Sequence, residues 1–313
     1  MNSLRMEEMK FLFSIFQFFH FSTFPFFNSN SFKMVFDIYT PMPIQELGQR
    51  LNQEDGIWPP IGKATAEDRL FMVCDGMGGH DNGELASATV CNALGVWFRK
   101  NVNPDAPFND DMLRSALEYA YCELDALDND SARKPGTTLT LLYLHKGGIT
   151  AAHMGDSRIY HIRPGEGIKY ISRDHSVAFE LFQSGEITYE EMLAYPQKNI
   201  VTRAMMPGED NRSRADIIHI TDVAAGDYFL LCSDGLLEQL ANKEILNIFS
   251  SGSSDEEIRS HLIDITAGNH DNHSAYIIHV RKVTLTDDEE DTLTNEELKS
   301  RYNQLNIIPK EYL

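Results

Sequence analysis

The chain has 313 residues, long for one ordinary domain and short for two large ones, so we expect one domain of roughly 250 residues with additional ends. A hydrophobic fraction of 42% with 18 Phe and 12 Tyr is enough for a globular core and excludes a disordered chain. The formal charge of −20, from 47 acidic and 27 basic residues, argues against a nucleic-acid partner, because phosphates would be repelled over most of the surface.

The first 33 residues differ in composition from the rest. Residues 11–27 read FLFSIFQFFHFSTFPFF, a Phe-rich run without charge and without a helical or strand period. A signal peptide or membrane anchor is one interpretation, but Pro25 and several polar residues weaken a spanning helix, and no small-residue cleavage site follows. We favour the other interpretation, translated sequence upstream of a true start at Met34, and do not expect membrane attachment.

Strands and two amphipathic helices are predicted next. KMVFDIYTPM is strand-like, and after a loop the apolar run at 71–74 predicts a strand that ends at Asp75-Gly76. A helix is expected over 83–100 and a second over 112–127, capped by Asn109 or Asp110, because apolar residues repeat at helical spacing in both.

The middle of the chain changes to a strand period. Strands are expected at 137–145, 148–154, 157–163 and 167–172, separated by the turn signals KGG, GD and PGEG. Such short turns join antiparallel neighbours, so long helices beside this meander favour helices packed on a sheet over a parallel βαβ array. Residues 177–206 are more helical and less apolar, which predicts a surface excursion.

Two later segments again combine a strand with acidic residues. DYFLLCSDGLLEQL predicts a strand, then Asp234-Gly235, then a helix, and in GNHDNHSAYIIHV the pair Asp271-Asn272 precedes a strand. Residues 284–313 are acidic and lack a core pattern, which predicts a tail or a lone helix.

The cysteines indicate a reducing compartment. Cys74, Cys91, Cys122 and Cys232 have no C-x-x-C spacing and lie in apolar segments, which predicts packed thiols in a cytoplasmic protein. None of them is followed by Arg in the C-x5-R spacing of a cysteine-dependent phosphatase.

Four acids share one setting: Asp75, Asp156, Asp234 and Asp271 each lie at a strand end or in a tight turn after apolar residues. One such Asp is usually only turn chemistry, but the repetition suggests a common site. If the sheet brings the acids together, cations have to offset their repulsion, and oxygen ligands without His or Cys select magnesium or manganese. Gly76 suits this site, because without a Cβ its carbonyl can approach the same ion.

The motifs and their order resemble the metal-dependent protein phosphatase family, the type 2C serine/threonine phosphatases, in its bacterial form. The matching motifs are RLNQED, VCDGMGGHDNGELAS, GTTLT, AHMGDSRIY, RDHS, NIVTRAM, LLCSDGL and the DN of HDNHSAY. The resemblance implies an α+β fold, a four-layer α-β-β-α sandwich of two antiparallel β-sheets flanked by pairs of helices. It places the catalytic domain at 34–283, a flap-like excursion at about 177–206, and two Mn2+ or Mg2+ ions in a cleft at one edge of the sandwich.

The same resemblance assigns roles to single residues. Asp75 would bridge both ions, Gly76 would add its carbonyl, and Asp234 and Asp271 would complete the shell of the second ion. The other implied roles are phosphate binding by Arg50, water binding around the first ion by Glu54 and Asp55, a hydrogen bond near the second ion by Asn272, and an optional third metal held by Asp156, Asp234 and Glu238. Hydrolysis of phosphoserine and phosphothreonine would proceed by in-line attack of a hydroxide shared by the two ions, without a covalent enzyme intermediate.

Met77 departs from part of the family. Some members carry a His directly after the Asp-Gly, suited to protonating the leaving oxygen, and a thioether cannot donate a proton. Because bacterial-type members commonly have Met there, this departure leaves the general acid unassigned without removing the expected activity. His80 and His153 are nearby in sequence, but a lone His is more often structural.

Two other functions stay open. A pseudophosphatase that only binds phosphoprotein predicts the loss of a metal ligand, and none is missing; a metal-dependent hydrolase of a small phosphoester would differ in its preferred substrate. The expected partners of the enzyme are phosphoserine and phosphothreonine proteins and a cognate serine/threonine kinase, and the expected state is a cytoplasmic monomer. The sequence does not name the physiological substrate.

Overall fold

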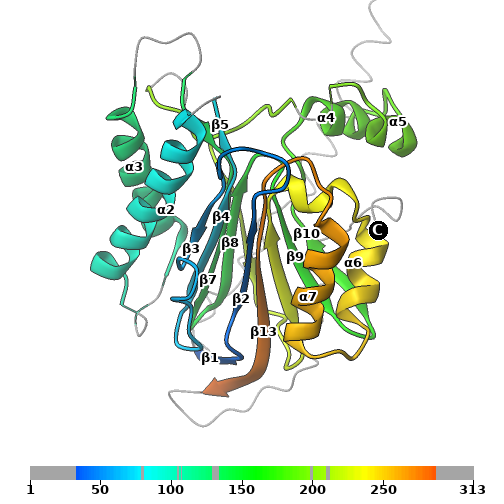
Figure 1. The fold of residues 1–313 in the computed structure, drawn as a ribbon. Coiled ribbons are helices and arrows are strands. Elements are labelled where there is room, and N and C mark those ends of the chain that lie inside the picture. Colours follow the sequence, from blue (N-terminus) through cyan, green and yellow to red (C-terminus); the bar gives the residue numbers. More distant parts are fainter. Residues whose placement is uncertain are drawn as a thin grey trace, which may run out of the picture.

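The computed structural model describes residues 33–286, apart from 79–80, 104–105, 107, 129–133, 198–199 and 209–211. The expectations for the Phe-rich segment before Lys33 and for 287–313 therefore lie outside the described residues. Two antiparallel β-sheets pack face to face, and pairs of helices cover their outer faces (Figure 1). This is the four-layer sandwich that the motifs predicted.

The first sheet has six strands. Its order is β1 (Lys33–Ile38), β13 (His273–Thr286), β12 (Tyr228–Cys232), β9 (Arg158–Arg163) and β10 (Gly167–Ile171), and β2 (Met42–Glu46) also pairs with β13. β13 is long enough to pair with β2 along its first half and with β1 along its second. It continues to Thr286, three residues past the boundary expected at Val283, because its last residues pair with the first residues of β1.

The second sheet has five strands, in the order β11 (Asp216–Ile220), β8 (Gly148–Met154), β7 (Leu139–His145), β4 (Leu70–Cys74) and β3 (Gly56–Trp58). A short ribbon of β5 (Gly76–Met77) and β6 (Gly136–Thr137) continues from it. All residues of β4, β7 and β8 are buried. These strands have a sheet on one face and helices on the other, which explains why they read as continuous apolar runs without alternation.

The helices cover the sheets in two pairs. α2 (Asp81–Asn101) and α3 (Asp110–Asp125) lie on the second sheet, and α6 (Asn242–Phe249) and α7 (Asp255–Thr266) lie on the first (Figure 1). Asn109, one of the two residues predicted as the cap of this helix, is the N-cap of α3. Its side chain accepts a hydrogen bond from the Met112 N–H (3.0 Å). None of the helices within the described residues is long and apolar enough to cross a membrane.

Two segments leave this plan. α4 (Val177–Gln183) and α5 (Tyr189–Leu193) form the predicted excursion, above the first sheet in Figure 1. The helix expected directly after Asp234-Gly235 is a 3-10 turn, η2 (Asp234–Glu238). Asn269 donates a hydrogen bond to the Gly235 carbonyl oxygen (2.6 Å), which an α-helix would use for the N–H four residues on.

A buried ionic cluster lies where β12 begins, at the opposite end of that strand from Asp234. Asp227 is fully buried, and its carboxylate accepts two hydrogen bonds from Arg163 (2.7 and 2.8 Å) and one from Nε2 of His161 (2.8 Å). Arg163 also bonds Asp222 (3.2 Å). The His161 ring stacks on Phe229, a residue of the core between the two sheets, with ring centroids 4.5 Å apart. The cluster therefore joins β9 to the turn before β12 by charge as well as by backbone pairing.

Candidate metal centre

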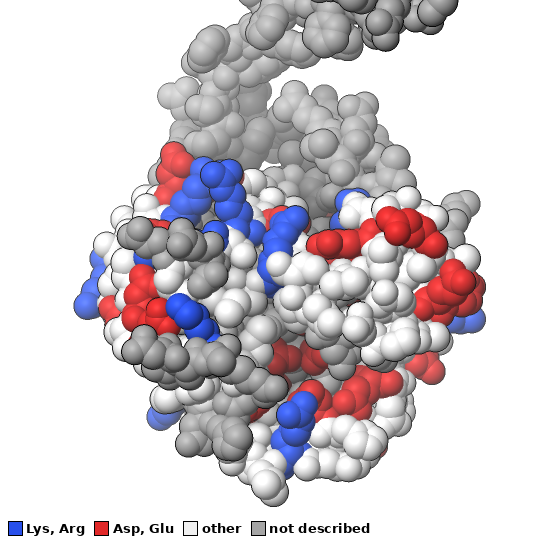
Figure 2. Space-filling model, turned by 90° about the horizontal axis from the view of Figure 1, so that it is seen from above, with Lys and Arg blue, Asp and Glu red and all other residues white. Residues whose placement is uncertain are grey.

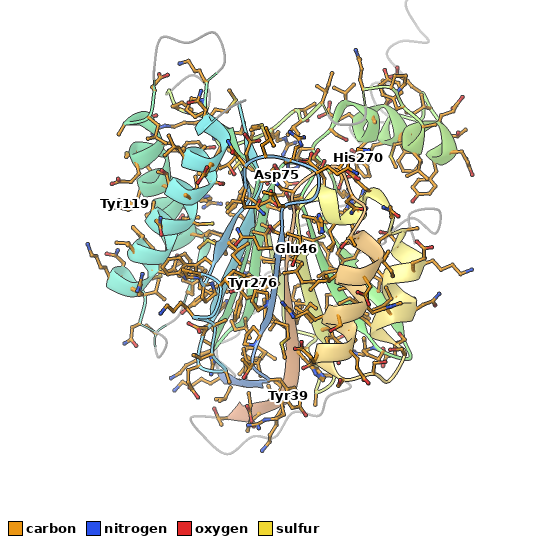
Figure 3. The ribbon with its side chains drawn as sticks, viewed as in Figure 1. Tyr39, Glu46, Asp75, Tyr119, His270 and Tyr276 are labelled. Carbon is orange, nitrogen blue, oxygen red and sulfur yellow. The ribbon has the colours of Figure 1, made fainter. Side chains whose placement is uncertain are left out.

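Three of the predicted acids meet at the upper edge of the sandwich. β4 ends directly before Asp75 and β12 ends just before Asp234, while Asp271 lies just before β13. Asp75 and His270 are labelled at this edge in Figure 3, and Tyr39 lies at the opposite end of the molecule. Because β4 and β12 belong to different sheets, the acids meet across the sandwich, and the charge of Asp234 is close enough to Asp75 to raise its pKa.

Two threonines hold the backbone of Asp75. The Asp75 N–H donates to Oγ1 of Thr138 (2.9 Å), and the Thr138 N–H donates back to the Asp75 carbonyl oxygen (2.9 Å). Oγ1 of Thr137 donates to the same carbonyl oxygen (2.9 Å). This anchoring leaves the Asp75 carboxyl group to face the cluster. The sequence contained the signal, the GTTLT motif, but no role was assigned to it.

Gly76 lies between two backbone segments that leave no room for a side chain. A Cβ on Gly76 would lie 2.2 Å from the carbonyl oxygen of Gly83 and 2.4 Å from that of Glu54. The Gly76 N–H donates to the same Glu54 oxygen (3.1 Å). Gly76 is thus required for the start of α2 and the loop at Glu54 to close on the site.

Asn272 shapes the loop that carries the phosphate-binding candidate. Its Oδ1 accepts the Glu54 N–H (2.8 Å), and its Nδ2 donates to the carbonyl oxygens of Leu47 (2.9 Å) and Asn52 (3.0 Å). All three contacts are to backbone, so the structure gives Asn272 a positioning role for residues 47–54, in addition to the hydrogen bond near the second ion that stays a prediction.

Arg50 lies at the rim of the cluster. One of its terminal nitrogens donates to Oδ2 of Asp271 (2.7 Å), and about half of its side chain is exposed. Figure 2 shows this upper face, with acidic side chains in a hollow near its middle, Lys and Arg side chains on some sides of it and further acidic side chains on others. A guanidinium in this place can bond a phosphate that enters the hollow.

Ionising the acids of the cluster is unfavourable in free energy, because they are buried beside one another. Burial and the neighbouring carboxylates raise the pKa of Asp75, Asp234 and Asp156. Burial likewise raises the pKa of Asp55 to about 7, although its Oδ2 accepts a hydrogen bond from Ser233 (2.8 Å). Divalent cations remove this cost, and a donor set of carboxylates and backbone carbonyls fits Mn2+ or Mg2+. The residues present therefore fit the metal that the sequence predicted.

Glu238 shapes a turn of the cluster. Its two carboxylate oxygens accept the backbone N–H groups of His270 (2.9 Å) and Asp271 (3.1 Å), which fixes the segment before β13. It is close enough to Asp234 to raise the pKa of that residue together with burial. Its role as a ligand of a third metal stays a prediction.

His153 does not supply the missing proton donor. His80 lies outside the described residues. His153 is buried, its Nε2 donates to the carbonyl oxygen of Arg173 (2.8 Å), and burial lowers its pKa to about 4. At neutral pH its ring is therefore uncharged with its N–H already bonded, which agrees with the structural interpretation of this residue.

His153 also belongs to a group with His175 and Asp216 whose possible ligand atoms lie within 4.8 Å of one another. The two imidazole rings are stacked, with centroids 4.7 Å apart and planes inclined by 15°. An ion bound in the plane of one ring lies out of the plane of the other, so this stacking disfavours a metal shared by both. We interpret the group as a hydrogen-bonded cluster.

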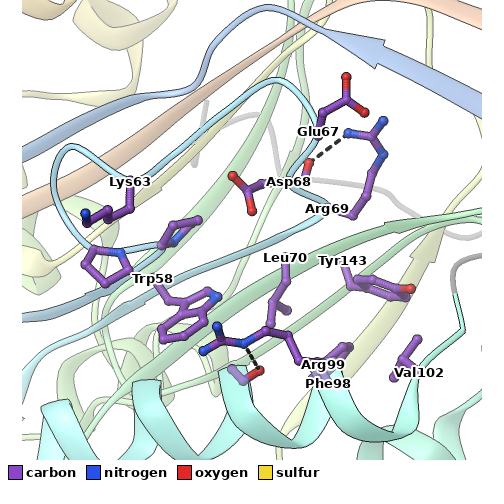
Figure 4. Close-up of a pocket in the computed structure, with 13 residues that line it drawn as sticks. Trp58, Lys63, Glu67, Asp68, Arg69, Leu70, Phe98, Arg99, Val102 and Tyr143 are labelled. Atoms are coloured by element: carbon purple, nitrogen blue, oxygen red, sulfur yellow. Dashed lines mark hydrogen bonds between the residues drawn. The ribbon is translucent and has the colours of Figure 1, made fainter.

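A separate pocket of about 700 Å3 lies between residues 58–70 and the second half of α2 (Figure 4). Arg99 stands over the Trp58 ring, 4.7 Å from its centroid, and Phe98 contributes to an apolar wall. The pocket contains none of the clustered acids, and its charged residues are of both signs. It is therefore not the place where the predicted chemistry happens.

Known proteins resemble this chain in sequence and in structure. A family model described as Protein phosphatase 2C matches residues 53–262. Protein phosphatase PhpP of Streptococcus pneumoniae is 34% identical over 211 residues, which cover 66% of this chain and 83% of PhpP. The structure of the serine/threonine phosphatase PstP/Ppp of Mycobacterium tuberculosis matches with a TM-score of 0.67 at 28% identity, covering 78% of this chain and 99% of that one.

A further structure bears on the metal. The catalytic domain of the serine/threonine protein phosphatase PstP, in complex with two manganese ions, matches with a TM-score of 0.62 at 28% identity and covers 80% of this chain and 100% of that one. The family match includes Asp75 and Asp234, and the fold adds Arg50 and Asp271, which lie outside the matched residues, to the same cluster. This chain belongs to the protein phosphatase 2C family, the metal-dependent protein serine/threonine phosphatases.

Proposed function

We propose that this chain removes phosphate from phosphoserine and phosphothreonine in proteins at the acidic cluster, with Asp75, Gly76, Asp234 and Asp271 holding two Mn2+ or Mg2+ ions. The observation that supports this assignment most is the approach of Asp75 and Asp234, which two different sheets bring close enough together for the charge of Asp234 to raise the pKa of Asp75. The test is turnover of a phosphothreonine peptide with manganese and again after its removal by EDTA. A preference for small metabolite phosphates over the peptide would contradict the substrate class.

The chain's own residues prepare the reaction in three ways. The two ions that Asp75, Gly76, Asp234 and Asp271 would hold would lower the pKa of a water, so that hydroxide would be available as the nucleophile near neutral pH. Arg50 binds the phosphoryl oxygens and keeps the phosphate in line with the attack, which requires it to exchange Asp271 for the substrate. Thr138 and Asn272 keep the metal-binding loops rigid, so that little reorganisation is needed during the reaction.

The partner and the location follow from the substrate class. A phosphoserine or phosphothreonine exists only where a kinase has made it, so a cognate serine/threonine kinase in the same compartment is part of the proposal. Cys74, Cys91, Cys122 and Cys232 are all free, which supports a reducing compartment such as the cytoplasm. Three of them are packed as predicted, but the prediction is wrong for Cys122, which is exposed on α3. The proposed catalytic domain is the expected 34–283 extended to Thr286, where β13 ends, and the proposed state is a monomer.

Replacing Arg50 by Ala should lower kcat/KM for a phosphothreonine peptide and for p-nitrophenyl phosphate alike. Both substrates present the same phosphoryl oxygens and lose the same charge-assisted hydrogen bonds, which amounts to about tenfold to a hundredfold. Steady-state kinetics on the two substrates measures this. Arg281→Ala is the matched control, since Arg281 is also an exposed Arg bonded to a carboxylate, Asp37, and lies at the far end of β13. An equal loss in Arg281→Ala would exclude phosphate binding as the cause.

Replacing Asp156 by Ala should affect the two substrates unequally. Serine and threonine alkoxides are poor leaving groups that need a proton, whereas p-nitrophenolate needs little help. Because Met77 cannot donate a proton, we propose that a water on the third metal, which Asp156 would help to hold, would supply it. The variant should lose much more rate on the phosphopeptide than on p-nitrophenyl phosphate, with two ions still bound per chain by metal analysis. Equal losses would show that Asp156 supports the core metals or the fold.

A further inference from the structure

The RDHS segment, residues 173–176, holds the turn that carries Asp156 from both sides. On one side, Asp174 accepts two hydrogen bonds from Arg158, at 2.7 Å from Nε and 2.6 Å from a terminal nitrogen. On the other side, the Arg173 carbonyl oxygen accepts the hydrogen bond from His153 (2.8 Å). His153 and Arg158 flank the turn between β8 and β9, so both of its ends are fixed to one segment.

His175 contacts the turn itself. The backbone N–H of His175 donates to the Gly155 carbonyl oxygen (2.9 Å), and the backbone N–H of Gly155 donates to Nδ1 of the His175 ring (3.2 Å). Since Nδ1 accepts a hydrogen bond, the proton of the neutral ring is on Nε2, which donates to Oδ2 of Asp216 (3.2 Å). Both ring nitrogens of this buried side chain are therefore used, one on the turn and one on β11.

The turn also rests against the strand segment that holds Asp75. Gly155 has φ +99°, and a Cβ on it would lie 2.5 Å from Cγ2 of Thr138. The hydroxyl groups of Thr138 and Ser157 are 2.7 Å apart. A shift of the turn would therefore disturb Thr138, the residue that anchors the backbone of Asp75.

Backbone hydrogen bonds hold both ends of the flap, residues 177–206, close to His175. The Val177 N–H donates to the Ile200 carbonyl oxygen (3.0 Å), and the Thr202 N–H donates to the His175 carbonyl oxygen (2.8 Å). Arg203 donates to Oδ1 of Asp216 (2.9 Å), the residue whose other oxygen binds His175. The base of the flap and the Asp156 turn thus share His175.

We propose that His175 is a positioning residue that fixes the Asp156 turn to the base of the flap, and that the contact which matters for catalysis is the Gly155 N–H to Nδ1 bond. His175 acts through Asp156 and touches no reacting atom. The catalytic part of this inference rests on the proposed function, because it assumes that Asp156 supports proton supply to the leaving group. The structural part, the link from His175 to Gly155, does not.

Two substitutions separate the ring nitrogens. His175→Asn keeps an acceptor close to the place of Nδ1, and His175→Gln keeps a donor close to the place of Nε2. Both remove the stacking on His153, so a difference between them reports the two hydrogen bonds. His219→Ala is the control, since His219 lies on the same strand as Asp216, is half-exposed and contacts Thr150 and Asp110.

The first measurement is amide hydrogen exchange of residues 153–158 in the metal-free protein. We expect faster exchange at this turn in His175→Gln and His175→Ala, and exchange close to the wild type in His175→Asn and His219→Ala. Because the Asn and Gln variants are compared with each other, the test holds even if the Ala variant does not fold. Protection retained in the Gln variant and lost in the Asn variant would overturn the assignment.

The second measurement is kinetic. Loss of the Nδ1 bond should lower kcat on the phosphothreonine peptide by about tenfold, with little change in KM and little change on p-nitrophenyl phosphate. Combined with Asp156→Ala, the His175→Gln change should cause no further loss, because both act at one place. Additive losses would overturn the proposal. If the wild type does not cleave the peptide at all, the proposed function fails, while the exchange measurement still decides on the link between His175 and the turn.

Discussion

Replacing Asp75 by Ala, or Asp234 by Asn, should abolish phosphopeptide turnover while the protein remains folded. The metal ions are expected to supply most of the rate acceleration by generating the nucleophile. Losing a ligand at the centre of the cluster should therefore lower the turnover rate by about a thousandfold or more. The fold should persist because each change removes charge repulsion at the edge of the sandwich without opening a core. Initial rates on a phosphothreonine peptide and thermal unfolding, each with and without manganese, check both parts.

The control for this prediction is Asp264→Asn, which removes an equal charge from the exposed face of α7. It should leave turnover unchanged. Manganese should raise the melting temperature of the wild type and of Asp264→Asn more than that of Asp75→Ala, because binding to the folded state alone stabilises it. Full activity of the wild type in EDTA, after metal analysis has shown that the ions are gone, would refute a metal-dependent reaction.

Replacing Asp227 by Ala should lower the free energy of unfolding by about 3 kcal/mol, the usual cost of removing one partner of a buried ion pair. Arg163 and His161 would lose their shared acceptor in the core, although Arg163 keeps Asp222, which argues for the lower end of the usual range. Urea unfolding followed by circular dichroism measures the change. Asp37→Ala is the matched control: Asp37 binds Arg281 at 2.6 Å, but that pair is exposed and should contribute little.

Asp227 should also make the stability of the fold depend on pH in acid. Burial alone would raise the pKa of Asp227, but the hydrogen bonds from Arg163 and His161 outweigh it and lower the pKa to about 2. The pKa of the folded state is below that of the unfolded chain, so the stabilisation is complete above about pH 4 and is lost as the pH falls toward 2. The stability difference between wild type and Asp227→Ala should shrink over this interval. A difference that stays constant down to pH 2 would contradict the ionic origin.

The acids of the metal centre were predictable because each leaves a local mark. An apolar run that ends in Asp-Gly shows in the sequence where a buried strand reaches the edge of a sheet, and Asp75 and Asp234 both follow this rule. The helix α3 and its cap were predictable for the same reason, since Asn109 and the apolar spacing are local.

The remaining features depend on contacts between distant segments. Nothing in the sequence near Gly235 shows that Asn269 will take its carbonyl oxygen, so the 3-10 turn in place of a helix was not predictable. The role of Asn272 in the loop at Glu54 joins residues more than 200 positions apart, and His175 shows its use only once the Asp156 turn lies against it. Motif order identified these residues without giving the reason for them.

The position of β13 in the sandwich makes the metal centre depend on a late part of the chain. β13 is the last strand described, yet it lies inside the first sheet, with β12 on one side and β1 and β2 on the other. The residues just before it provide Asp271 and the amide that shapes the loop at Arg50. While the ribosome still holds β13, the nascent chain has neither a closed first sheet nor a complete acidic cluster. The acidic cluster can therefore be complete only after β13 and the segment before it have left the ribosome.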